Sequence, residues 1–327
     1  MGRCAVRRTR GCTEASAPAA TSRGGRVNQI RISLEVAAAL REKRPVVALE
    51  STITSSLGLP APYNRECYDR VEAAIRAEGA VPAVTGILDG SLIAGAEPSD
   101  VERLLTATRK VAERDLPIAL AQGAPTAVTT VSASVAIAAR VGIRVFATGG
   151  IGGVHRGAAE SFDISSDLGA IARHPVLVVS AGAKAFLDLA KTLEYLEMLS
   201  VPVIGYETDE FPAFWSRTSG LKVPARLDSP RDIAVAAHAA TISGWGGGML
   251  IANPIPFTDE IPASEIAAAI EKGLAAAAAS GATGAAVTPK ILAAIAAATE
   301  SRSIPANLAL AESNARLAAK IAAALLD

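Results

Sequence analysis

The 327-residue chain is poor in cysteine, histidine and aromatic residues. Its three cysteines, Cys4, Cys12 and Cys67, are too few for a disulfide framework and lack the spacing of a zinc site, so we expect a reducing compartment, the cytoplasm. The three histidines are scattered along the chain, which argues against a His-rich metal site. Aromatic residues make up 4% of the chain and hydrophobic residues 50%, so Ala, Val, Ile and Leu must fill a large core.

The chain also lacks long uninterrupted apolar runs. Its Ala-rich stretches, such as "EIAAAIEKGLAAAAASGA" at residues 265–282, are broken by charges and glycine. A membrane-spanning helix needs roughly 20 consecutive apolar residues. We therefore expect a soluble globular protein without a membrane partner.

Formal net charge is zero, but it is unevenly distributed. Residues 1–31 contain seven arginines and one acid, which leaves 25 basic and 31 acidic residues in the rest, a net charge of −6. A body of that sign is not expected to bind nucleic acid through its phosphates. The Arg- and Ser-rich start is similar to a transit peptide, but it lacks apolar periodicity. We predict a basic, disordered extension over residues 1–27, with an upstream start codon and organellar targeting left open, and a single domain over 28–327.

Short β-branched runs alternate with amphipathic runs along this domain. This alternation predicts an α/β fold with a mostly parallel sheet. Strands are predicted at 45–52, 81–90, 143–150, 175–182, 201–209 and 247–256. Helices are predicted at 64–80, 98–114 (capped by Ser99 or Asp100), 129–142, 166–174, 183–199 and 229–244, followed by three Ala-rich helices, with a loop at 121–128. Ligands bind at the carboxyl ends of parallel strands, which directs attention to Glu50, Gly149–Gly153, Lys184 and Asn253.

Lys184 and Glu50 each lie at the end of a predicted apolar strand. Lys184 is expected in the first turn of the next helix, where the helix dipole opposes its charge and lowers its pKa, so that a neutral amine can attack a carbon atom. Glu50 ends the apolar run "PVVALE", where desolvation should raise its pKa toward the range useful for proton transfer. The alternatives are an exposed lysine that covers the helix start and a glutamate that begins a loop.

Residues 146–168, "FATGGIGGVHRGAAESFDISSDL", combine glycines with oxygen ligands. Asp163 and Asp167 are four residues apart, which on a helix places both carboxylates on one face, and beside Ser165 and Ser166 they suit a hard cation such as Mg²⁺ or Mn²⁺. A capping aspartate is the alternative. The glycines either let backbone amides approach a phosphate or allow close packing.

His155 and Lys110 have weaker signals. His155 lies in the glycine-rich segment, where an ordinary loop histidine is equally compatible with the sequence. Lys110 is predicted near a helix end, where its positive charge suits the helix dipole. It would be either a phosphate contact or a solvated lysine.

Several longer motifs together resemble the pseudouridine-5'-phosphate glycosidases, the indigoidine synthase A family. The resemblance runs from about residue 28 to 325, and its motifs are "VVALEST", "KVAERDLP", "VFATGGIGGVHRG", "FDISSDL", "SAGAKAFLDL", "TLEYLE", "VPVIGY", "PAFWSRTSG", "RLDS" and "GGGMLIANPIP". It implies a homotrimeric three-layer α/β/α enzyme of pseudouridine catabolism, classed by convention as a carbon–oxygen lyase. The implied reaction is the reversible cleavage of pseudouridine 5'-phosphate to uracil and ribose 5-phosphate, with a divalent cation, typically Mn²⁺.

The same resemblance implies roles for individual residues. Glu50 would be the proton donor, Lys184 the nucleophile and Asp163 the metal ligand. The substrate contacts would be Lys110, Val131, Ser165, Ser166, Asp167 and Asn307.

A C-glycoside poses a particular chemical problem, because the atom that leaves is carbon. Ordinary glycosidases protonate a departing oxygen between two carboxylates. We hypothesise that Glu50 protonates the ribose ring oxygen and that Lys184 holds C1′ as a covalent adduct, which collapses to an imine as uracil leaves. A cation at Asp163 would orient and polarise substrate groups, and Lys110 and the amides of residues 149–153 would hold the phosphate.

Two loops depart from the family pattern. After "EST" the family usually has Ile-Ile-Ser-His-Gly, whereas this chain has "ITSSLG", and "AQGAPTAVTT" carries one extra residue. These departures leave the exact substrate open. The alternatives are a related C–C lyase that acts on another modified sugar phosphate and a catalytically silent sugar-phosphate-binding protein.

Overall fold

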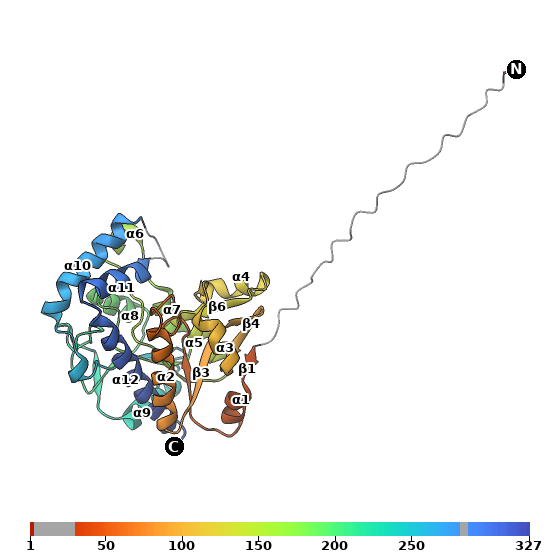
Figure 1. The fold of residues 1–327 in the computed structure, drawn as a ribbon. Coiled ribbons are helices and arrows are strands. Elements are labelled where there is room, and N and C mark those ends of the chain that lie inside the picture. The colour runs from red at the N-terminus through yellow and green to blue at the C-terminus, as the bar shows by residue number, and fades with distance from the viewer. Residues whose placement is uncertain (3–29, 282–286) are drawn as a thin grey trace.

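A parallel-rich sheet forms the centre of the structure, a computed structural model that describes residues 1–2, 30–281 and 287–327 (Figure 1). Its strand order is β1-β4-β3-β2-β7-β8-β11-β9-β10, with β6 pairing to β3 and β5 to β6. Pairing is parallel except where β3 meets β4 and β6. The strands are β1 (Arg31–Ile32), β2 (Val46–Leu49), β3 (Val81–Leu88), β4 (Ser91–Ala94), β5 (Lys110–Val111), β6 (Thr126–Thr129), β7 (Val145–Ala147), β8 (Leu177–Ser180), β9 (Val203–Tyr206), β10 (Ala225–Leu227) and β11 (Met249–Ala252).

The inner strands are buried along their whole length and almost entirely apolar. Every residue of β2, β7, β8 and β11 is buried. Strands covered by helices on both faces cannot alternate between apolar and polar residues, so they read as continuous Val, Ile, Leu and Ala runs. These four strands are consecutive in the sheet and parallel, so their carboxyl ends lie at one edge.

Helices cover both faces of the sheet. On one face α12 packs over β2, β7 and β8 and against α2 and α9, and on the other α5 and α7 pack together (Figure 1). The α-helices are α1 (Leu34–Arg41), α2 (Tyr63–Ala77), α3 (Pro98–Leu105), α4 (Leu116–Ala121), α5 (Val131–Arg140), α6 (Ala158–Ser161), α7 (Ser166–Arg173), α8 (Leu189–Met198), α9 (Pro230–Ile242), α10 (Ala263–Ala279), α11 (Val287–Ala298) and α12 (Ser303–Ala324), and short 3₁₀ turns are η1 (Glu113–Asp115) and η2 (Phe257–Asp259).

The predicted fold class, a single three-layer α/β/α domain with a mostly parallel sheet, is confirmed. The predicted strands and the three Ala-rich helices are present. Of the predicted N-terminal extension, residues 3–27 lie outside the described residues. No helix in the described ranges is long and apolar enough to cross a membrane.

The prediction of one helix over 98–114 is wrong. The helix α3 ends at Leu105, and Lys110 and Val111 form β5, which pairs with β6 inside the predicted loop at 121–128. The pairing partners Val128 and Thr129 are fully buried, so sheet burial overrides the helical periodicity of this segment. The cap is Glu97, with Asp100 completing the capping box, so neither predicted cap is correct.

Candidate active site

A cavity of about 760 Å³ opens at the carboxyl ends of the central strands. The nine site residues named from the sequence all line it, although they come from six different parts of the chain. They are Glu50, Lys110, Val131, Asp163, Ser165, Ser166, Asp167, Lys184 and Asn307. The structure brings these residues together, while their individual roles stay predictions.

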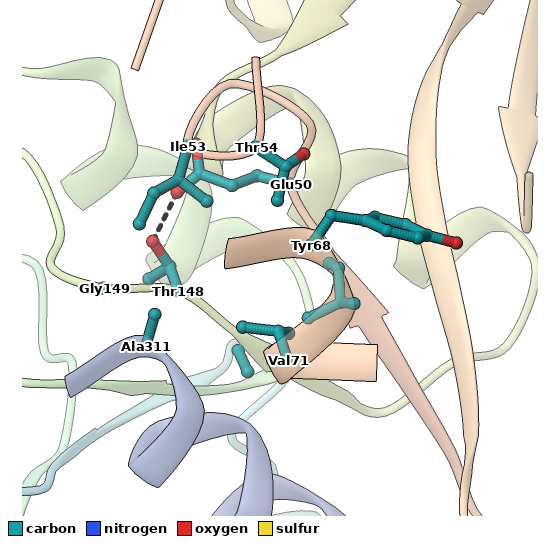
Figure 2. A pocket seen from close by; sticks show the side chains of 10 residues that line it. Glu50, Ile53, Thr54, Tyr68, Val71, Thr148, Gly149 and Ala311 are labelled. Carbon is teal, nitrogen blue, oxygen red and sulfur yellow. Dashed lines mark hydrogen bonds between the residues drawn. The ribbon is translucent and has the colours of Figure 1, made fainter. Parts of the chain in front are cut away.

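Glu50 follows β2 directly and is 7% exposed. The Thr148 hydroxyl donates a hydrogen bond to Glu50 Oε1 (Figure 2). Burial raises the pKa of Glu50 above its ordinary value, as predicted, and this effect exceeds the opposing influence of the Lys184 charge and the Thr148 hydrogen bond. A carboxyl group of this kind holds its proton to higher pH than a solvated one and is suited to act as an acid.

Lys184 lies after β8 and reaches toward the end of β7. Its Nζ donates to the Gly150 carbonyl at 2.6 Å, and its backbone N–H donates to the Ile151 carbonyl at 3.1 Å. The prediction that Lys184 lies in the first turn of a helix is wrong, because α8 begins only at Leu189, where Asp188 caps it. Between β8 and α8, Gly182 and Ala183 form isolated bridges, and the Leu187 N–H then closes a turn on the Lys184 carbonyl at 3.0 Å. The helix dipole acts only over its own first turn.

Lys110 is the second cation of the cavity. Its position in β5 corrects the prediction that it lies near a helix end. Burial lowers the pKa of Lys110 below its ordinary value, and the charge of Lys184 acts in the same direction, while Glu50 and Asp167 oppose them. Two lysines and two carboxylates therefore interact across this cavity.

Asp163 and Asp167 do not share a helix face, contrary to the prediction. The helix α7 begins at Ser166, so Asp163 lies in the preceding turn, after Phe162 at φ +53°. The Asp167 carboxylate is buried and accepts backbone N–H groups of Ser132 and Gly152, both at 2.9 Å. Asp167 thus ties α5, the glycine-rich segment and α7 together, and its charge is held by backbone dipoles.

Asp163 is more accessible than Asp167. Its side chain is 38% exposed, and Oδ2 lies 3.8 Å from Nδ1 of His155. Burial lowers the pKa of His155, which the Asp163 charge opposes. His155 is therefore part of the cavity rather than an ordinary loop histidine.

Hydroxyl and amide groups complete the polar lining. Ser165 caps α7 by accepting the Asp167 N–H at 3.2 Å, and the Ser166 hydroxyl lies 3.1 Å from that of Ser132. Asn307 of α12 is buried, and its Oδ1 accepts the Trp215 indole N–H at 2.7 Å. This bond leaves the amide nitrogen of Asn307 as the group that can donate into the cavity.

The glycines after β7 serve close packing. A Cβ on Gly150 would lie 2.5 Å from Phe214, and one on Gly152 would lie 2.3 Å from the Ser165 hydroxyl. The Gly152 N–H donates to Asp167, and the Ile151 N–H donates to the Gly182 carbonyl at 3.1 Å. Of the two explanations considered from the sequence, contact with a phosphate through these amides is therefore the weaker.

Sequence reasoning missed Thr148. The register of the β2–β7 pair sets Leu49 beside Ala147, so the residues that follow, Glu50 and Thr148, are neighbours. Thr148 is also the last residue before the glycines in "VFATGG", a polar residue at the carboxyl end of a buried strand. That position was the available signal, but the strand order was needed to read it.

A divalent cation fits this site only with help from water or substrate. Within residues 30–281 and 287–327, no group of three or more His, Cys, Asp or Glu side chains could hold a metal ion. Asp163, with His155 beside it and Ser165 nearby in the lining, offers the single carboxylate that Mg²⁺ or Mn²⁺ often takes while keeping several waters. The donor set is therefore compatible with a hard, largely hydrated ion.

The family model described as indigoidine synthase A-like protein matches residues 35–324. The chain belongs to this family. It is 52% identical to a pseudouridine-5'-phosphate glycosidase of Methylobacterium nodulans over 89% of this chain and 86% of the relative. It is 50% identical to a protein of the same name from Paracoccus denitrificans, over 90% and 98% of the two chains.

Solved structures agree with this family. The crystal structure of a prealnumycin C-glycosynthase in complex with ribulose 5-phosphate is similar with a TM-score of 0.83 at 40% identity, over 91% of this chain and 97% of the other. An indigoidine synthase A-like protein from Thermotoga maritima has a TM-score of 0.82 at 36% identity, over the same shares of the two chains. The predicted family, its fold and the prediction of an enzyme are confirmed.

Proposed function

We propose that the protein reversibly cleaves the C–C glycosidic bond of pseudouridine 5'-phosphate to uracil and ribose 5-phosphate. One observation carries this proposal. A buried carboxyl group, Glu50, and an amine, Lys184, line the same cavity at neighbouring strand ends, in a chain about 50% identical to proteins named for this activity. A carboxylic acid and an amine are the two groups that ring opening and covalent capture of a C-glycoside require.

The first step opens the ribose ring. Protonated Glu50 gives its proton to the ring oxygen O4′, and the C1′–O4′ bond breaks as its electron pair passes to that oxygen. The amine of Lys184 forms a new bond to C1′ and passes a proton to the Glu50 carboxylate. The sugar is then an open chain joined at C1′ to both uracil and Lys184.

The second step releases uracil. The Lys184 nitrogen forms a double bond to C1′ while the C1′–C5 bond breaks. C5 of uracil takes the electron pair of that bond and the proton held by Glu50. The resulting imine adds water and regenerates free Lys184 and the aldehyde of ribose 5-phosphate. The net reaction consumes one water, and every step can run in reverse.

The remaining lining residues would bind and orient the substrate. We place the 5'-phosphate near Lys110 and the start of α7, where the Ser165 and Ser166 hydroxyls and the helix dipole favour an anion. Asn307 is expected to donate its amide nitrogen to the substrate, and Val131 to pack against it. A cation at Asp163, Mn²⁺ or another divalent ion, would supply positive charge that orients and polarises substrate oxygens.

Uracil release tests the proposal directly. Purified protein is incubated with pseudouridine 5'-phosphate and Mn²⁺, with and without a chelator, and ultraviolet absorbance follows free uracil. We expect turnover that the chelator suppresses and Mn²⁺ restores. Borohydride added in the presence of ribose 5-phosphate should fix a pentose phosphate on Lys184, detected by mass spectrometry, and an adduct on another residue or none would reject the imine.

A related C–C lyase with a different aglycone is the second candidate. A structural neighbour at 40% identity is named a C-glycosynthase, and both loops that depart from the family pattern contribute to the cavity wall. Ile53, Leu57 and Gly58 come from the first loop and Thr130 from the second. An enzyme of this kind would form the same lysine adduct with ribose 5-phosphate but release no uracil.

We also propose a homotrimer in the cytoplasm, as the family resemblance and the reducing compartment imply. Light scattering on the purified chain measures its oligomeric state. A mass near three times 33.2 kDa is expected, whereas a monomer or dimer would reject the trimer.

A further inference from the structure

Three residues after β7, Thr148–Gly150, contact both of the side chains to which chemistry is assigned. The Thr148 hydroxyl donates to Glu50 Oε1, and the Gly150 carbonyl accepts from Lys184 Nζ at 2.6 Å. The positions of the acid and the amine therefore depend on one short piece of backbone.

Asn314 of α12 holds this segment from behind. It is fully buried, and its Nδ2 donates to the carbonyls of Thr148 at 2.8 Å and Gly149 at 3.2 Å. Its Oδ1 accepts from Nδ2 of Asn253, which follows β11, at 2.9 Å. These bonds link the ends of β7 and β11 through one helix side chain. They therefore fix the position of the Thr148 backbone relative to the sheet.

A small apolar chamber also borders Glu50 and Thr148 (Figure 2). It measures about 10 Å³, and its exposed lining is almost entirely apolar, with Ile53, Val71 and Ala311 among the side chains. Empty spaces of this character stay dry. Water in this chamber is therefore a poor substitute for the Thr148 hydroxyl as a partner of the carboxyl group.

We propose that Thr148 is a positioning residue for Glu50 and that Asn314 in turn fixes Thr148. The inference rests on the proposed role of Glu50 as proton donor. The hydroxyl holds one carboxyl oxygen, so that the other turns toward the substrate. Because it donates a hydrogen bond, it also stabilises the ionised form and so sets the pH at which the acid loses its proton.

Other charged and titratable groups face Glu50 and must be counted. Lys184 after β8 and Lys110 in β5 favour its ionised form, whereas Asp167 in α7 disfavours it. Cys67 in α2 is close enough to sense the Glu50 charge, and burial raises the pKa of this thiol to about 12, so it is neutral at working pH. These groups are untouched by a change at Thr148, so a shift can be assigned to the lost hydroxyl.

Thr148→Val tests the proposal because valine has nearly the same shape and lacks the hydroxyl. We expect kcat to fall about tenfold to a hundredfold with little change in KM. Loss of the bond raises the pKa of Glu50, so the alkaline limb of the pH–rate profile should move upward by about one pH unit. Thr148→Ser keeps the hydroxyl donor, so it should restore both kcat and the original position of the alkaline limb.

Thr299→Val is the matched control. Thr299 is another buried threonine, and its hydroxyl donates to the Ile295 carbonyl at 2.9 Å, away from the cavity lining. It should lower the melting temperature without moving the pH profile. If Thr148→Val behaves like this control, or if Thr148→Ser fails to rescue, the proposal is overturned; Thr148→Ala carries the same expectation should the valine variant not fold.

Two further variants separate the parts of the argument. Asn314→Ala should move the alkaline limb in the same direction by a smaller amount, and an unchanged limb would remove Asn314 from the proposal. Glu50→Gln tests the underlying role of the acid. Full turnover in Glu50→Gln would refute the proposed function of Glu50, whereas an inactive Glu50→Gln beside a normal Thr148→Val would refute the positioning role alone.

Discussion

The two sides of the cavity differ in how they are built. The inner wall, Glu50, Thr148, Gly150 and Lys184, stands on the ends of buried strands, and Glu50 and Thr148 are 7% and 4% exposed. The rim, Arg114 with residues 161–166, belongs to short turns around α6 and η1, and Phe162 is 81% exposed. The groups that we propose to break bonds thus lie at the ends of buried strands, whereas the rim lies on turns, which vary more readily in sequence.

The inner wall and the rim also differ in what the loss of a hydrogen-bond partner costs. On the inner wall a charge is costly unless it is paired, so each polar group there has a partner that fixes it. At the rim water can replace a lost partner. Changes on the inner wall should therefore alter kcat strongly, and changes at the rim should alter binding by smaller factors.

Lys184→Ala should have the largest effect on the inner wall. Without the amine no covalent adduct can form, so uracil release should fall by about four orders of magnitude. The substrate should still bind, which isothermal calorimetry would detect. Lys191→Ala, at an exposed lysine paired with Asp188, is the control and should keep full activity; near-normal turnover in Lys184→Ala would contradict the assignment.

Glu50→Gln should come next, with a fall in kcat of about a hundredfold to ten-thousandfold. It should also stabilise the fold in a pH-dependent way. Because burial raises the pKa of Glu50 in the folded state, the unfolded chain ionises first, and stability is lost as pH rises from the ordinary value through the raised one.

The melting-temperature gain of Glu50→Gln over the parent should therefore grow with pH across that window and vanish in acid. Thermal scans at several pH values measure it. A constant gain at all pH values would show that the folded-state pKa is not raised.

The inner wall is also where sequence reasoning succeeded. Apolar runs such as "PVVALE" and "PVLVVSAG" predict buried parallel strands, and the residue after each strand, as with Glu50, then falls at the ligand edge. Partners across strands were not predictable, because the pairing of Glu50 with Thr148 follows from a strand order that no local pattern encodes.

Local patterns were least informative for Lys110 and for the segment that leads into α7. Lys110 was assigned to a helix because its segment has helical composition, yet pairing with β6 decides its conformation. Asp163 and Asp167 were placed on one helix because of their spacing, yet the left-handed turn at Phe162 and the Ser165 cap start the helix only at Ser166. Spacing alone cannot show where a helix begins.

Asp163→Asn tests the expectation that changes at the rim affect binding more than kcat. Loss of the carboxylate charge should raise the Mn²⁺ concentration needed for half-maximal activity by about tenfold, with a smaller change at saturating Mn²⁺. Activity titrated with Mn²⁺ after chelator treatment measures this. Asp69→Asn, on the exposed surface of α2, should leave the titration unchanged, and the same curve for Asp163→Asn would exclude Asp163 as the ligand.

Gly152→Ala should have the smallest effect on rate and tests how the inner wall supports the rim. The new Cβ would lie 2.3 Å from the Ser165 hydroxyl and 2.9 Å from Asp167 Oδ2, so the start of α7 must shift. Overpacking of this kind costs about 1–3 kcal/mol, and KM should rise several-fold while kcat changes little. Gly246→Ala is the matched control, since a Cβ there meets nothing within 4 Å. If both variants had the same KM and the same melting temperature, Ser165 and Asp167 would not depend on the close approach of Gly152, and the rim would be independent of the strand ends behind it.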